Sequence, residues 1–185
     1  KALGVSGAAA AGSLVAPRPS GAVTVFFGRP HVEQLAKTGR PTAKRAMDMA
    51  EALEARGASE PEIQARTNRL FEHDDPTLGP VTKTEGQWVV EASDQGRRLR
   101  DNGPEMSTLG KELDHPDVFE ASPGAADIPL QRVPGQRSGY SYPRPAGHPK
   151  GEYPGKMLIG DEAPPTHVPH EIQHHLDRET GLSRG

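Results

Sequence analysis

One segment near the end of the chain has an apolar stripe on one side of a predicted helix and two histidines on the other. An apolar stripe recurs in it at four-residue spacing: Val168, Ile172 and Leu176. At about 100° per residue, His170 and His174 lie roughly opposite this stripe on a helix, one turn from each other. The pattern predicts a helix over about 166–180, capped by Thr166 and stopped by Gly181. We expect it to bury the stripe against a sheet that contains the strand of Trp88 or the strand 156–159, and to turn both histidines outward.

The two histidines belong to the pattern H-E-x-x-H, which spans residues 170–174. Histidines four apart on a helix can reach the same metal ion, and Glu171 is placed to take a proton from a metal-activated water. The chain contains no cysteine, so His, Asp, Glu and water are the available ligands. We therefore predict zinc as the cofactor, His170 and His174 as its ligands and Glu171 as the catalytic residue. The alternative is a solvated amphipathic helix with histidines on its wet face.

A catalytic zinc usually has three protein ligands, so a third ligand is required. Asp177 shares the histidine face but lies about 10 Å along the helix from His170, at about 1.5 Å per residue, and is too distant. Glu179 lies off that face unless the helix unwinds before Gly181. The upstream candidates are His148, Glu152, Asp161, Glu162 and His167. A ligand beyond residue 185 is the other alternative.

Two further residues of the motif helix have simpler expected roles. His175 points about 100° away from His174, so we expect a surface group or a group that supports the site. Gln173 is expected to face solvent or to serve as a hydrogen-bond partner. Neither is predicted to bind the metal.

The composition limits the size of the core and the classes of partner. Hydrophobic residues make up 33% of the 185 residues and aromatic residues 4%, whereas there are 21 glycines and 19 prolines. This mixture indicates long loops around a small core. The net charge is −3 and no basic stripe is present, so we expect no nucleic-acid partner. No apolar run approaches the roughly 18 residues that span a bilayer, so we expect no membrane partner.

Local patterns predict an α+β fold with a small, mostly antiparallel sheet, a helical hairpin and the C-terminal motif helix. The expected strands are 23–27, 87–92, 128–133, 139–142 and 156–159. The expected helices are 42–56 and a second one opened by the capping box at 59–62, with a short helix near 114–117. Residues 1–22 are rich in Ala, Gly, Ser and Pro and are predicted to be a flexible linker, and residues 72–85 a polar loop. The folded domain is expected to span 23–185 and to be truncated at its C-terminus.

Several segments, in this order, are similar to one known family. They are 57–63 (G-A-S-E-P-E-I), 86–94 (G-Q-W-V-V-E-A-S-D), 113–116 (L-D-H-P), 126–130 (A-D-I-P-L) and 170–185, from H-E-I-Q-H to G-L-S-R-G. On these residues the chain, over roughly 24–185, resembles the zincin-like metallopeptidase modules of the large polyvalent protein-associated domains. Such modules occur in long multidomain proteins of phages and mobile elements. The chain departs from the family at 67–70, where T-N-R-L replaces T-G-W-F, and at Pro164, Pro165 and Pro169, where leucines are usual.

The resemblance implies a zincin-like fold, a peptide or protein substrate, and a place within a larger polyprotein. The alternative that it leaves open is a non-catalytic structural or interaction module of such a polyprotein. In peptidases of this type, the strand before the active helix often pairs with extended substrate. We therefore expect the strand 156–159 to have an unpaired edge that can bind a peptide by strand addition.

Overall fold

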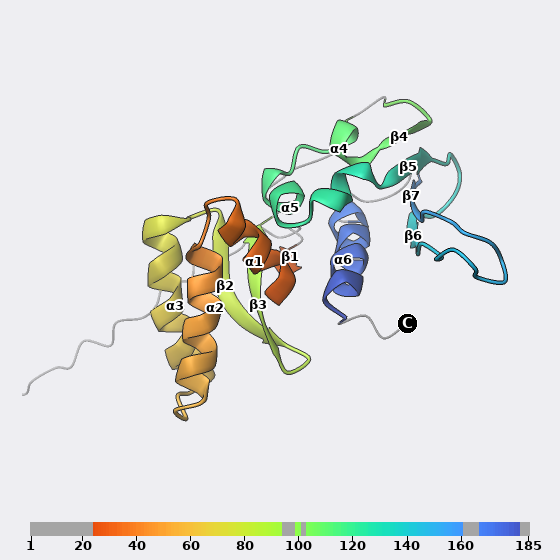
Figure 1. Cartoon of the computed structure of the whole chain (residues 1–185). Helices are drawn as coiled ribbons and strands as arrows, with labels where there is room; N and C mark the ends of the chain where they lie inside the picture. Colours follow the sequence, from red (N-terminus) through yellow and green to blue (C-terminus); the bar gives the residue numbers. More distant parts are fainter. Residues whose placement is uncertain (1–23, 94–98, 101–102, 161–166, 182–185) are drawn as a thin grey trace, which may run out of the picture.

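The architecture is α+β, with the motif helix lying between two sheets (Figure 1). The computed structural model describes residues 24–93, 99–100, 103–160 and 167–181. Within these residues the strands are mostly antiparallel, as expected, but they form two sheets of three and four strands instead of one. The expected linker 1–22 lies outside the described residues.

The first sheet has the strand order β1-β3-β2, with both pairings antiparallel. Its strands are β1 (Thr24–Phe27), β2 (Leu78–Thr84) and β3 (Gln87–Ser93). The predicted helical hairpin, α2 (Thr42–Glu54) and α3 (Glu60–Asp74), is confirmed and packs against this sheet. Trp88 of β3 is buried, as predicted for a core anchor, and its indole N–H donates a 2.8 Å hydrogen bond to Glu54.

Two elements of this half were not predicted, and proline explains both. The helix α1 (Arg29–Lys37) begins where Gly28 and Pro30 suggested only a break in the chain. A proline in the first turn is compatible with a helix, because the N–H that it lacks has no intrahelical partner there. The strand β2 lies within the expected polar loop 72–85. Its register with β3 shifts between Leu78 and Val81, and this irregularity accommodates Pro80 in a strand.

The second sheet has the strand order β4-β5-β7-β6. Its strands are β4 (Met106–Thr108), β5 (Pro129–Arg132), β6 (Gly139–Ser141) and β7 (Lys156–Ile159). Three short helices connect β4 to β5: α4 (Leu109–Glu112), α5 (Pro116–Ala121) and the 3-10 helix η1 (Pro123–Asp127). β7 pairs with β5 on one side, in parallel, and with β6 on the other, antiparallel. The expectation that β7 has an unpaired edge is therefore wrong, because the hairpin partner β6 covers that edge.

The motif helix α6 (His167–Thr180) contacts β1 of the first sheet, β6 of the second sheet and α1 (Figure 1). Its predicted apolar stripe is buried and belongs to a single core that includes Phe27 of β1 and Met157 of β7. The helix ends at Thr180, and Gly181 adopts φ +73°, which glycine tolerates best. The predicted cap Thr166 lies outside the described residues. Among the helices that the structure describes, none is long and apolar enough to cross a bilayer.

Arg40 ties the N-terminal helices to α5 through a cluster of carboxylates. Its guanidinium donates hydrogen bonds of 2.9 and 3.0 Å to Asp75, of 2.8 Å to Asp117 and of 2.9 Å to Glu120. Burial opposes the charge on Arg40, but the hydrogen bonds outweigh this effect and the pKa of Arg40 is raised. The positive charge of Arg40 therefore offsets the repulsion and the burial cost of these carboxylates.

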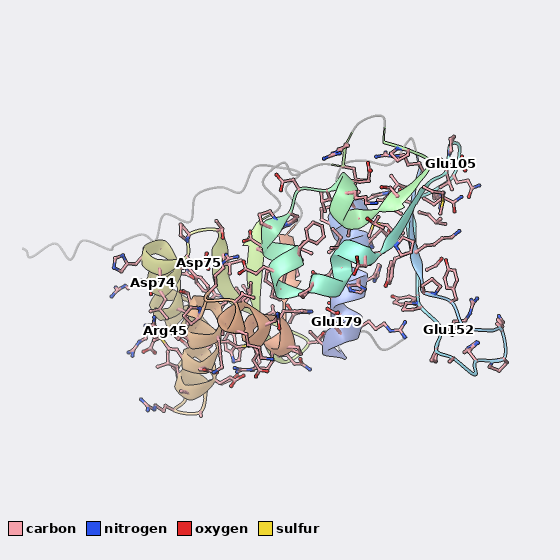
Figure 2. All side chains as sticks on the ribbon, turned by 45° about the horizontal axis from the view of Figure 1, so that its top comes forward. Arg45, Asp74, Asp75, Glu105, Glu152 and Glu179 are labelled. Carbon is pink, nitrogen blue, oxygen red and sulfur yellow. The ribbon has the colours of Figure 1, made fainter. Side chains whose placement is uncertain are left out.

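Replacing Arg40 with methionine should lower the free energy of unfolding by about 3–5 kcal/mol, because it removes the cation facing buried carboxylates. The side chains of Asp75 and Asp117 are only 9% and 5% exposed. Arg45→Met is the matched control, since the Arg45–Asp74 pair has side chains 59% and 34% exposed (Figure 2). It should cost less than about 1 kcal/mol. Urea unfolding of both variants measures the difference, and equal losses would contradict the role of Arg40.

Candidate metal centre

α6 brings the two predicted ligands together. The Nε2 atoms of His170 and His174 lie 3.2 Å apart, with the ring centroids 4.6 Å apart and the ring planes at 76°. Two zinc–nitrogen bonds of about 2.0–2.1 Å at a tetrahedral angle separate their nitrogens by about 3.3 Å. The two nitrogens therefore already have the spacing that one tetrahedral ion requires.

The exposure of the motif residues agrees with the predicted orientation of α6. His170 is exposed and His174 is half-buried, whereas Ile172 and Leu176 on the other side are fully buried. Glu171, the residue after His170, is 7% exposed. α6 therefore turns its apolar stripe to the core and His170 outward.

Gln173, in the middle of the motif, joins α6 to the edge of β1. The backbone N–H of Phe26 donates a 2.7 Å hydrogen bond to the Gln173 amide oxygen, and the amide nitrogen donates a 3.3 Å bond to the carbonyl of Phe26. The same nitrogen donates a 2.6 Å bond to Asp177. Gln173 is thus a hydrogen-bond partner, one of its two predicted roles, and its amide pairs with β1 as a neighbouring strand would.

On the side of the histidine face away from Gln173, His175 joins α6 to β6 and, through Glu179, to α1. Its Nδ1 lies 2.9 Å from the Tyr140 hydroxyl, and its Nε2 lies 3.5 Å from the Glu179 carboxylate. Glu179 lies near the end of α6 (Figure 2) and also meets Nε2 of the buried His31, at 2.9 Å. His175 therefore turns Nδ1 to the Tyr140 hydroxyl and Nε2 toward Glu179, and so packs between α6 and β6.

The charge of Glu179 is stabilised by the side chains around it. Burial would raise its pKa, but the contacts with His175 and His31 outweigh burial, and the pKa of Glu179 lies well below its ordinary value. Burial raises the pKa of Tyr140, so its hydroxyl keeps its proton. Glu179 is therefore an anion that links α6 to α1 throughout the neutral pH range.

Tyr142, directly after β6, is a site residue that the local sequence patterns did not reveal. Its hydroxyl lies 3.5 Å from Nδ1 of His174, although 41% of the residue is exposed. The guanidinium of Arg178 lies 5.9 Å from its ring centroid. Two signals were present in the sequence: Tyr140 and Tyr142 share one face of a strand, and Arg178 follows His174 by one helical turn.

The candidates for a third ligand lie elsewhere. His148 and Glu152 are exposed on the long loop between β6 and β7, where Figure 2 labels Glu152. Gln173 donates a hydrogen bond to Asp177, and Glu179 faces His31 of α1 and His175 of α6. Asp161 and Glu162 lie outside the described residues. Across ranges 24–93, 99–100, 103–160 and 167–181, no three His, Asp or Glu side chains, His167 included, are arranged to hold a metal.

Comparison of the chain with protein-family models, curated proteins and solved structures gives no match. The resemblance to the zincin-like modules therefore stays a prediction based on the motif segments.

Proposed function

We propose that this chain is a zinc-dependent metallopeptidase module that hydrolyses peptide bonds in a protein or peptide substrate. The observation that carries the proposal is the 3.2 Å separation of the His170 and His174 Nε2 atoms on the open face of α6, with the buried Glu171 beside them. The similarity of the motif segments to modules of phage and mobile-element polyproteins supports the same class of activity.

His170 and His174 would hold the ion through Nε2. Zinc, when bound, supplies a Lewis acid that polarises a carbonyl oxygen and makes water acidic enough to attack near neutral pH. Glu171 accepts the proton of the attacking water as the new carbon–oxygen bond forms. It then donates that proton to the amine nitrogen as the carbon–nitrogen bond breaks. Its low exposure favours this role, because a carboxylate shielded from bulk water keeps the proton between the two steps.

We assign the substrate to the edge of β6 instead of β7. In the described sheet β6 is an edge strand, with β7 on one side only. It also lies beside the histidine face, since Tyr140 within it and Tyr142 after it reach His175 and His174. β1, on the other side of the histidine face, cannot bind a peptide in the same way at Phe26. The Gln173 side chain already uses the backbone N–H and carbonyl of that residue. An extended peptide added to β6 would therefore pass next to the proposed metal ligands.

Metal removal and restoration test this function. Titration of the metal-free protein with zinc should show one tight site per chain. The zinc-loaded protein should cleave members of a random peptide library, EDTA should stop cleavage, and added zinc should restore it. A protein that binds no zinc in this titration, or that cleaves equally well in EDTA, is not the metallopeptidase proposed here.

The second candidate is a non-catalytic structural or interaction module. One observation favours it: within the described ranges, no third His, Asp or Glu side chain stands with His170 and His174. A protein that binds zinc at these histidines but cleaves no library peptide would support this candidate.

A further inference from the structure

Two tyrosines from one stretch of chain meet two consecutive histidines of α6. Tyr140 and Tyr142 are two residues apart and pack edge to face, with ring centroids 5.3 Å apart. The Tyr140 hydroxyl lies 2.9 Å from Nδ1 of His175, and the Tyr142 hydroxyl lies 3.5 Å from Nδ1 of His174. Side chains two apart on an extended segment point to the same face, which places both hydroxyls against the helix. Both pairs join a tyrosine hydroxyl to a histidine Nδ1, but the two histidines face different surroundings.

The surroundings of His175 determine the direction of its hydrogen bond with Tyr140. The other ring nitrogen of His175, Nε2, faces the Glu179 carboxylate at 3.5 Å. A carboxylate accepts hydrogen bonds, so a neutral His175 carries its proton on Nε2 and has a lone pair on Nδ1. The Tyr140 hydroxyl, which is half-buried, then donates to Nδ1.

A metal ion at the histidine pair would require the opposite direction at His174. Its Nε2 faces Nε2 of His170 at 3.2 Å, on the side where an ion would be bound. A histidine that binds metal through Nε2 is neutral and carries its proton on Nδ1, which donates to an acceptor that fixes the ring. The Tyr142 hydroxyl oxygen stands at that nitrogen, and the described residues place no carboxylate there.

We propose that Tyr142 is a positioning residue for His174: its oxygen accepts the Nδ1–H hydrogen bond and so keeps the Nε2 lone pair directed at the metal. This inference rests on the proposed metal site. The separation of 3.5 Å is at the outer limit for a hydrogen bond, and hydrogen bonds of this kind tighten when a site is loaded. The same tautomer is compatible with the metal-free protein, because the 3.2 Å contact of the two Nε2 atoms is then a hydrogen bond if His170 carries its proton on Nε2.

Tyr142 is held in place despite its exposure. Arg178 of α6 lies over its ring, and the Nη1 atom of the same arginine donates a 3.0 Å hydrogen bond to the carbonyl of Pro143. The Tyr142 and His174 rings are in contact, with centroids 6.4 Å apart at 69°. These contacts from one helix fix both the tyrosine and the chain that follows it.

The test compares Tyr142→Phe with Tyr140→Phe, which removes the same atom from the neighbouring tyrosine. The zinc dissociation constant is measured by competition with a chelator, and the free energy of unfolding of each variant is measured in urea. Tyr142→Phe should weaken zinc binding about 10-fold, the lower end of the effect of such supporting residues, while the fold keeps its stability. Tyr140→Phe should leave zinc affinity within about twofold of the wild type, because His175 is not a ligand.

A second measurement does not depend on zinc. The tautomer of His174 is read from ring ¹⁵N chemical shifts of the metal-free protein, about two pH units above the ordinary histidine pKa near 6.5. We expect the Nδ1–H form in the wild type and in Tyr140→Phe, and loss of that preference in Tyr142→Phe. A wild-type His174 in the Nε2–H form, or a Tyr142→Phe protein with unchanged tautomer and zinc affinity, overturns the inference. If the wild type binds no zinc, the proposed function fails, and the tautomer measurement still decides the role of Tyr142.

Discussion

Glu171→Gln should lower the rate of peptide cleavage by about 100- to 10,000-fold, the range of a general base. Glutamine has nearly the same shape as glutamate but cannot accept the proton of the attacking water. The histidine pair does not depend on the carboxylate, since its geometry involves only the two rings. Zinc content and unfolding free energy should therefore stay close to wild-type values. Steady-state cleavage of a library-selected peptide, with zinc quantified in the same samples, measures the effect.

Glu105→Gln is the matched control for this experiment. Glu105 is exposed and lies just before β4, away from α6 (Figure 2). The same chemical change there should leave the cleavage rate unaltered. A Glu171→Gln protein that is fully loaded with zinc and cleaves at nearly the wild-type rate would show that Glu171 is not the base.

His174→Ala should abolish binding of zinc at one ion per chain, and His170→Ala should do the same. A catalytic zinc has about three protein ligands, so loss of one imidazole removes about a third of a binding free energy of about 10–16 kcal/mol and weakens affinity by at least about 100-fold. The fold should persist, because His170 is exposed, His174 is half-buried, and the core of α6 is made by the apolar stripe. Zinc bound after dialysis and the far-ultraviolet circular dichroism spectrum measure the two quantities.

His175→Ala separates a loss of metal ligation from damage to the helix. His175 is adjacent to His174, but its nitrogens face Tyr140 and Glu179. This variant should keep its zinc while losing some stability, because it removes contacts of α6 with β6. Equal zinc content in the wild type and in the His170 and His174 variants would rule out the metal centre. Loss of zinc in His175→Ala with an intact fold would show that His170 and His174 are not the pair of ligands.

Local periodicity was sufficient for the parts of the fold that repeat with the helix or strand period. The stripe of α6 is buried and its two histidines meet, because residues four apart on a helix share a face whatever surrounds them. The same reason holds for α2 and α3, whose apolar faces span several turns. β3 was recognised instead from its tryptophan and valines, which favour a strand. Short elements that contain proline, such as α1 and β2, carry a weaker signal, because proline marks helix starts and irregular strands as well as breaks.

The pairing partners of each strand depended on contacts that no local pattern records. β7 was predicted correctly as a strand, but its position in the interior of the sheet follows from its parallel pairing with β5 and its hairpin with β6. Composition and alternation describe one strand at a time, so they do not distinguish an edge strand from a central one. The assignment of the substrate to the edge of β6 therefore requires the strand order of the sheet.

The sequence by itself determined the motif helix, the pair of histidines and the glutamate beside them. These features depend only on the helix period and on the spacing of neighbouring residues. Only the tertiary structure decided what surrounds them. Tyr142 reaches His174 from 32 residues away, and Gln173 pairs with Phe26 from 147 residues away. His31 meets Glu179 across 148 residues. Such contacts depend on how two sheets and a helix pack into one core, and a residue's local neighbours carry no record of that packing.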